Sequence, residues 1–188
     1  AAGFLSTVFE RRALLPGVLI LLVNIGFGCI TSFITLYGQE QGIYQVSVYF
    51  IVYAVVTLAT RPMIGRLVDR HGFRTPGILS CLGTVLTLVL ISMSHDVFML
   101  TLAGVVAGLG IGTAMTVFQT MAVASVEPWR RGVATSTYFV AFDVGIAIGS
   151  LVGGGIADAL GYSAMYLIIS AFPLIACAIC AKATAKRG

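Results

Sequence analysis

The chain has 188 residues, of which 59% are hydrophobic and only 10% are charged, and its mean hydropathy is +1.03. This composition excludes an ordinary water-soluble domain, because such domains carry about 25% charged residues. The formal net charge is +4, but the basic residues are dispersed along the chain, which argues against a nucleic-acid partner.

Six long apolar segments predict six transmembrane helices. They lie near residues 13–37, 44–64, 76–94, 97–126, 132–160 and 162–181. Since a helix rises about 1.5 Å per residue, about 20 residues cross a hydrocarbon core of about 30 Å. Six such spans leave no room for a soluble domain. Pro173 falls inside the last segment, where we expect it to kink the helix.

The basic residues predict the orientation of these helices. Ten of the eleven Lys and Arg residues lie before the first segment or after the second, fourth and sixth, and Arg61 lies in the last turn of the second. The other connections, around Glu40, His95 and Asp158, contain none. Because basic residues are retained on the cytoplasmic side of a membrane, we expect both chain ends, residues 1–12 and 182–188, to be cytoplasmic. The chain begins without Met, so we also expect it to be part of a longer protein.

A short internal repeat divides the membrane unit of residues 13–181 into two parts. Its members are Gly65, Asp69, Gly72 and Phe73 in the first copy and Gly154, Asp158, Gly161 and Tyr162 in the second, 89 positions later (154 − 65). Only the first copy contains arginines, so the two copies should lie on opposite sides of the membrane. We therefore predict an all-α protein built from units of about 13–94 and 97–181 in inverted topology. This 3+3 inverted repeat is typical of secondary transporters, whose substrate site lies near the membrane midplane.

Glycines recur every four residues in the fourth and fifth segments. The two series are Gly104, Gly108 and Gly112, and Gly145, Gly149 and Gly153. Each series forms a smooth stripe on one helix face, which lets a neighbouring backbone approach closely. Two interpretations remain open: tight packing alone, or packing that also lets a helix slide against its partner.

Three polar residues at membrane depth are candidates for binding protons or substrate. Asp143 lies about 11 residues into the fifth segment, roughly 16 Å deep. A charged carboxylate at the bilayer centre costs about 2.5–3.5 kcal/mol, and no basic residue lies at the same depth. Asp143 is therefore protonated, faces a wet cavity, or pairs with a cationic substrate or a group outside this chain; a purely structural, neutral Asp143 remains an alternative. Asn24 and Gln119 either hold substrate or water or join helices.

Neither a metal nor an organic cofactor is expected. Cys177 and Cys180 have CxxC spacing, but no His or acidic residue is near them in the apolar segment, which favours a role as small core residues. An intramembrane enzyme needs a base beside a buried nucleophile. The two histidines, His71 and His95, lie in connections on opposite sides, so we expect that the protein is not an enzyme.

Residues 65–74, Gly-Arg-Leu-Val-Asp-Arg-His-Gly-Phe-Arg, resemble the signature loop of the major facilitator superfamily. In that family the loop joins the second and third helices of each six-helix half. The matching residues are Gly65, Asp69, Arg70, Gly72 and Arg74. Residues 145–154 are similar to the glycine-rich motif of the drug–proton antiporters of this family, although Ser150 stands where the motif has proline. Arg61-Pro62, Arg131-Gly132 and Asp143-x-Gly145 are most similar to the second half of such transporters.

The resemblance implies one six-helix half of a twelve-helix transporter in the bacterial inner membrane. Spans one and four would line the cavity, spans two and five would flank the other half, and spans three and six would face lipid. The loop would act as a cytoplasmic latch, extended by charges on Glu127, Arg130 and Arg131. The implied function is proton-coupled efflux of a small organic molecule, with a partner half or in a homodimer. The alternative is a non-transporting membrane scaffold, which would not need Asp143.

Overall fold

The computed structural model describes residues 10–185, and in this range all regular structure is helical. The predicted ends of the chain, residues 1–9 and 186–188, lie outside the described residues. The elements are η1 (Arg11–Ala13), α2 (Leu14–Glu40), α3 (Ser47–His71), α4 (Arg74–Ser92), α5 (Val97–Ala107), the π-helical η2 (Gly108–Gly112), α6 (Thr113–Ala124), η3 (Pro128–Arg130), α7 (Arg131–Leu160), α8 (Tyr162–Ile169) and α9 (Ala171–Ala185).

These elements form six helical passes that are long and apolar enough to cross a membrane, as predicted. The fourth pass runs continuously through α5, η2 and α6. The sixth is divided into α8 and α9 at Ser170, because Pro173 has no N–H to donate to the preceding turn. The second helix begins later than predicted, at Ser47, and continues past residue 64 to His71. The charged side chains in its last turns do not break the helix, which ends only at Gly72 with a φ of +65°.

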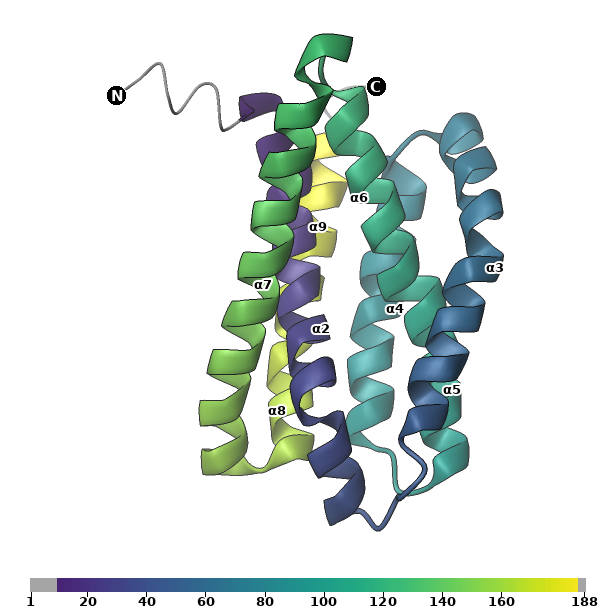
Figure 1. The fold of residues 1–188 in the computed structure, drawn as a ribbon, viewed down its shortest axis with the longest axis vertical. Coiled ribbons are helices and arrows are strands. Elements are labelled where there is room, and N and C mark those ends of the chain that lie inside the picture. The colour runs from purple at the N-terminus through teal and green to yellow at the C-terminus, as the bar shows by residue number, and fades with distance from the viewer. Residues whose placement is uncertain (1–9, 186–188) are drawn as a thin grey trace.

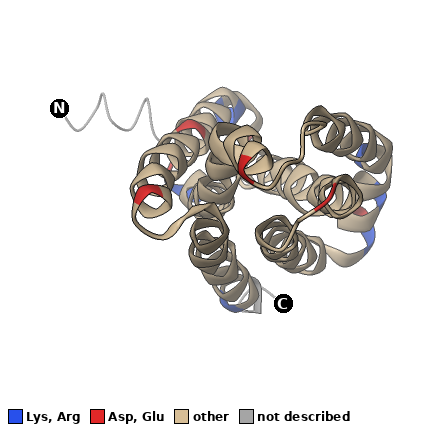
Figure 2. Cartoon of the chain, turned by 90° about the horizontal axis from the view of Figure 1, so that it is seen from below, with Lys and Arg blue, Asp and Glu red and all other residues tan. Residues whose placement is uncertain are grey.

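The passes stand side by side and run up and down between two ends of the bundle (Figure 1). One end contains η1, the α3–α4 connection, η3 and the last turns of α9; the other contains the α2–α3, α4–α5 and α7–α8 connections. Every Lys and Arg of the described residues belongs to the first group of segments or to the turns beside them, except Arg61, which lies ten positions before the end of α3 (71 − 61). We call this end the basic end. Figure 2 views the bundle from the opposite end, with the basic residues in blue.

The helices differ in how far the chain buries them. The span containing α2 is the most enclosed, with 67% of its most apolar stretch buried, whereas the corresponding values for α3 and α7 are only 11% and 17%. Residues of α2 belong to both hydrophobic core clusters, one around Tyr37 and Tyr49 and the other around Phe118 and Tyr138. The outer faces of α3 and α7 are therefore the largest surfaces that this chain leaves uncovered along its spans.

Candidate functional site

Asp143 lies near the middle of α7. Twelve positions separate it from Arg131, which is about 18 Å along a helix at about 1.5 Å per residue. Its side chain is exposed, as are those of Phe139, Val140 and Val144 on the same side of the helix. Gly145 contacts α2, and a helix turns by about 200° over two residues, so Asp143 points away from α2. Within this chain the carboxylate therefore lies on an outer, largely apolar face at mid-length of a membrane span.

Asn24 lies in α2, and the chain buries it completely. Its Nδ2 donates a hydrogen bond of 3.1 Å to the carbonyl oxygen of Phe142, the residue before Asp143. Its Oδ1 is buried and has no hydrogen-bond partner among the described residues. An unsatisfied buried acceptor costs about 1–3 kcal/mol. Asn24 thus fixes α2 to the backbone beside Asp143 and keeps one hydrogen-bonding position unused.

Gln119 lies on α6 and is half-buried. Among the described residues, no hydrogen bond connects its side chain with Asn24 or Asp143. The structure therefore brings Asn24 next to the Asp143 backbone, whereas Gln119 stands on a separate helix that packs on both α2 and α7.

The expected gate motif forms the end of α3 and the start of α4. Gly72 follows the last helical residue with a φ of +65°, and its N–H donates to the carbonyl oxygen of Val68 at 2.8 Å. Asp69, Arg70 and Arg74 are exposed. None of these three side chains forms an ion pair with another residue in the described part of the chain. Gly65 lies on the exposed side of α3, where an added Cβ would meet no atom within 4 Å.

The second copy of the repeat has the same local geometry. Gly161 ends α7 with a φ of +83°, and its N–H donates to the carbonyl oxygen of Ala157 at 2.8 Å, as Gly72 does at α3. The two turns lie at opposite ends of the bundle (Figure 1). The spacing shared by the two copies therefore corresponds to one kind of helix end used twice.

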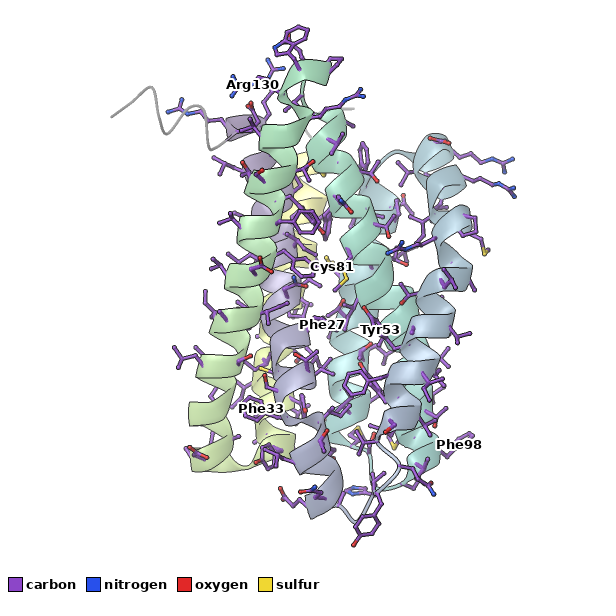
Figure 3. The ribbon with its side chains drawn as sticks, in the orientation of Figure 1. Phe27, Phe33, Tyr53, Cys81, Phe98 and Arg130 are labelled. Carbon is purple, nitrogen blue, oxygen red and sulfur yellow. The ribbon has the colours of Figure 1, made fainter. Side chains whose placement is uncertain are left out.

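Glu10 is a residue of the basic end that the sequence patterns did not single out. Its carboxylate forms an ion pair with Arg130 of η3, which lies near the N-terminal helix in Figure 3. It also accepts a hydrogen bond from the backbone N–H of Arg12 at 3.2 Å, and the Glu10 N–H donates to Thr137 Oγ1. The hydrogen bond from Arg12 and the Arg130 guanidinium lower the pKa of Glu10. No motif marks Glu10, because the pairing depends on a contact 120 positions away.

The expected gate charge network of Glu127, Arg130 and Arg131 stays a prediction, and the ion pair that the structure shows at Arg130 is with Glu10. Glu127 precedes η3 with an exposed side chain, and Arg131 is exposed at the start of α7. The ion pair described for Arg130 joins η3 to Glu10, which precedes η1. Among the described residues, no group of three or more His, Cys, Asp or Glu side chains is arranged to hold a metal ion.

Comparison with known proteins identifies relatives of this chain. The sequence profile of the Major Facilitator Superfamily matches residues 2–187. An uncharacterised MFS-type transporter of Burkholderia mallei (strain SAVP1) and one of Burkholderia pseudomallei (strain K96243) are each 26% identical over 156 residues. The uncharacterised MFS-type transporter YhhS of Salmonella enteritidis PT4 is 25% identical over 157 residues. These alignments cover 83% of this chain but only 38% of each relative, so the chain spans about half the length of these transporters.

Proposed function

This chain belongs to the major facilitator superfamily of membrane transporters, and we propose that it is one half of a proton-coupled carrier that exports small organic molecules. In this proposal the chain encloses a transport cavity with a partner half or with a second copy of itself. The observation that carries the proposal is the position of Asp143, at mid-span on the outer face of the six-helix unit.

Lipid is an unsuitable environment for that face. A carboxylate at mid-depth costs about 2.5–3.5 kcal/mol, and ionisable residues in membrane spans face a bundle interior or a water-filled cavity. The six helices of this chain do not enclose Asp143, so another protein surface or a wet cavity must cover it. This requirement favours an assembly of twelve helices over an isolated unit of six.

The exposed sides of α3 and α7 are suitable for contact with a second six-helix unit. Ile51, Val55 and Leu58 of α3 are each more than 60% exposed, and Leu151 of α7 is 80% exposed. They are the helices that the resemblance places beside the other half. Both surfaces are apolar around these residues, and the charged groups exposed along the same helices include Asp143 on α7 and Arg61 on α3.

The repeated helix ends at Gly72 and Gly161 support an inverted pair of three-helix units. Units of inverted topology exchange two conformations that open to opposite sides of a membrane. Asp143 then supplies a carboxyl group for proton exchange, and Asn24 holds the backbone beside it. The assignment to efflux rests on the similarity of residues 145–154 to the motif of drug–proton antiporters.

The test is proton movement driven by a model cation. Inverted membrane vesicles containing the chain, alone or joined to its partner half, are energised to an acidic interior, and ethidium is added while a pH-sensitive dye reports the gradient. We expect ethidium to dissipate the gradient with the wild-type chain and not with Asp143→Asn. The control is Asp158→Asn, an exposed carboxylate at the end of the same helix, which should retain the wild-type response.

The alternative function is a membrane scaffold, which would need the glycine packing but no proton exchange. Equal ethidium responses of the wild type and Asp143→Asn would remove proton coupling through this residue. If the wild-type chain gave no ethidium response either alone or joined to its partner half, efflux of organic cations would be contradicted.

A further inference from the structure

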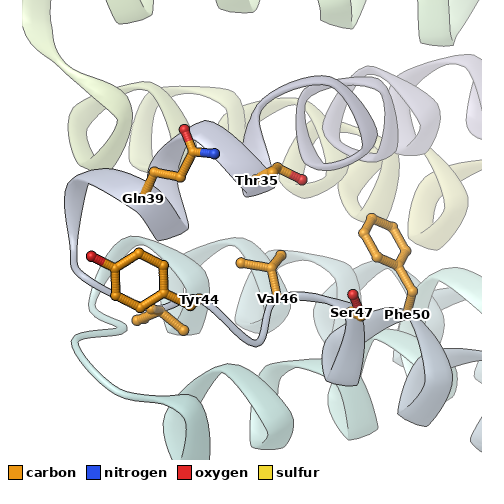
Figure 4. Close-up of a pocket in the computed structure, with 7 residues that line it drawn as sticks. Thr35, Gln39, Tyr44, Val46, Ser47 and Phe50 are labelled. Carbon is orange, nitrogen blue, oxygen red and sulfur yellow. The ribbon is translucent and has the colours of Figure 1, made fainter.

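A pocket lies between the end of α2 and the start of α3, at the end of the bundle opposite the basic end (Figure 4). Its volume is about 160 Å³. Seven residues line it: Thr35, Gln39, Ile43, Tyr44, Val46, Ser47 and Phe50. It is remote in sequence from Asp143 and shares no residue with the candidate proton site.

The turn between the two helices forms this pocket through its own hydrogen bonds. The N–H of Ile43 donates to the carbonyl oxygen of Gly38 at 2.6 Å, and the N–H of Gln41 donates to that of Tyr37 at 3.0 Å. Gly38 lets the turn lie close to α2, since a Cβ there would overlap the Val46 side chain and lie 2.9 Å from the Ile43 oxygen. Ile43 and Val46 are consequently buried as the floor of the pocket. The pocket is thus formed before any ligand binds.

The polar groups around this floor are not engaged elsewhere. Most Ser and Thr hydroxyls in these helices donate to a carbonyl oxygen about one turn earlier, as Thr31 does to Phe27 at 3.1 Å. Thr35, one turn after Thr31 on the same exposed side of α2, makes no such bond among the described residues. The side chains of Gln39 and Ser47 also have no hydrogen-bond partner in the described part of the chain. Two hydroxyls and one carboxamide on exposed side chains therefore border an apolar floor, where a bound molecule can replace water as their hydrogen-bond partner.

The size and charge of the pocket limit what it can hold. An enclosed cavity of about 150 Å³ in another protein accommodates benzene. This pocket has a similar volume but is partly open, so a single ring bound there would keep part of its surface exposed. The seven residues that line it carry no charge, and Phe50 supplies an aromatic surface. An uncharged ring with a hydrogen-bonding substituent matches this lining, whereas an ion does not.

We propose that this pocket binds an uncharged, single-ring organic molecule that carries an amide or hydroxyl group. The ring packs on Ile43, Val46 and Phe50, and the substituent bonds to Thr35, Gln39 and Ser47. Binding itself does not depend on transport or on Asp143.

Benzamide is the probe for this site, and saturation-transfer NMR on the full chain in lipid nanodiscs measures its binding. Thr35→Val and Gln39→Leu should each weaken binding by about three- to tenfold, which corresponds to one lost hydrogen bond. The matched control is Thr31→Val, which removes a hydroxyl from the same side of α2, one turn away, where the hydroxyl is already bonded to its own helix. Thr31→Val should bind as the wild type does.

Ser47→Ala provides a second test on the other helix, in case a change in α2 impairs folding. Two results would overturn the proposal. Equal saturation transfer in empty nanodiscs would mean that benzamide dissolves in lipid, and equal affinity of the wild type and all pocket variants would mean that these side chains do not bind it. Benzamide binding should persist in Asp143→Asn. A failure of proton-coupled transport and a failure of this site are therefore separate results.

Discussion

The two glycine-lined helix contacts of this molecule are built differently. Where α7 crosses α2, a Cβ added to Gly145 would lie 2.5 Å from the carbonyl oxygen of Leu21, and one added to Gly149 would overlap that of Ile25. Where η2 meets α3, a Cβ at Gly108 would lie 2.6 Å from the Val56 side chain, and one at Gly112 would overlap the side chain of Thr57. At these four glycines the first contact is limited by backbone and the second mainly by side chains, although a Cβ at Gly104, in the same series as Gly108, would lie 2.9 Å from the backbone oxygen of Tyr49.

Hydrogen bonds between the helices follow the same division. Asn24 and Cys29 of α2 donate to the carbonyl oxygens of Phe142 and Gly149, and the hydroxyls of Ser32 and Ser150 lie 2.7 Å apart. Between α3 and the fourth pass, the described contact is the long one from Tyr53 to the Met115 sulfur at 3.8 Å.

The same glycine spacing therefore produces a pair limited by backbone at Gly145 and Gly149, α2–α7, and a contact between α3 and η2 that we expect to have more freedom. The π-helical turn lies in the second contact, and π-helical turns are frequent at functional sites. The helix with more freedom, α3, also ends in the expected gate motif. We infer that α3 moves more readily than α7 does.

The largest expected effect is that of Gly149→Ala. The added methyl group overlaps the backbone of α2, which cannot move without separating the helix pair, so we expect a loss of about 3 kcal/mol in the free energy of unfolding. Unfolding in mixed detergent micelles, followed by circular dichroism, measures it. The control is Gly155→Ala on the same helix, where no atom lies within 4 Å of the added Cβ. Because alanine favours helix over glycine, this variant should be neutral or more stable by up to about 1 kcal/mol.

A smaller effect is expected for Gly112→Ala. The nearest atoms all belong to the side chain of Thr57, which can rotate away, and the gain in helix propensity offsets part of the cost. We expect a change within about 1 kcal/mol of the wild type, measured by the same method. If Gly112→Ala were as damaging as Gly149→Ala, the two contacts would be equally rigid and the comparison would fail.

The smallest effect is expected for Glu10. At the basic end, this residue pairs with Arg130 and donates a hydrogen bond to Thr137 of α7. Its pKa is lowered in the folded chain from the ordinary value of 4.5 by the Arg12 N–H and by Arg130. A carboxyl with a lowered pKa stabilises the fold above its unfolded-state pKa, and the contribution disappears as the pH falls through the folded pKa. The difference in unfolding free energy between wild type and Glu10→Gln should therefore be present at pH 7 and decrease below pH 4.5. A difference independent of pH would contradict the ion pair.

The sequence predicted the parts of this molecule that depend on local patterns. The length of the apolar segments predicted the six passes, and Pro173 predicted a break in the last one. The glycine spacing indicated which helix faces pack closely, α7 on α2 and η2 on α3. The repeat predicted an inverted topology, which stays a prediction; in the structure its two copies share one feature, a helix that ends at a glycine with positive φ, Gly72 and Gly161.

Features that depend on distant contacts could not be read from the sequence. The partner of Glu10 is 120 positions away, and the pocket depends on how a turn folds back on α2. The π-helical turn depends on η2 packing against α4, where Gly83 and Gly110 meet. Depth along a helix placed Asp143 at mid-span, but only the packing of α7 on α2 determines that the carboxylate faces outward. Membrane orientation, proton coupling and the partner of this half stay predictions.

The most direct test of the account is the environment of position 143 in the membrane. Asp143→Cys and Leu174→Cys, the latter on the exposed side of α9, are made in a background without the four native cysteines and are treated with a hydrophilic maleimide in intact membranes. We predict that Asp143→Cys is labelled because it faces a wet cavity, and that Leu174→Cys is protected by lipid. Equal protection at both positions would place residue 143 away from water and contradict the proposed cavity.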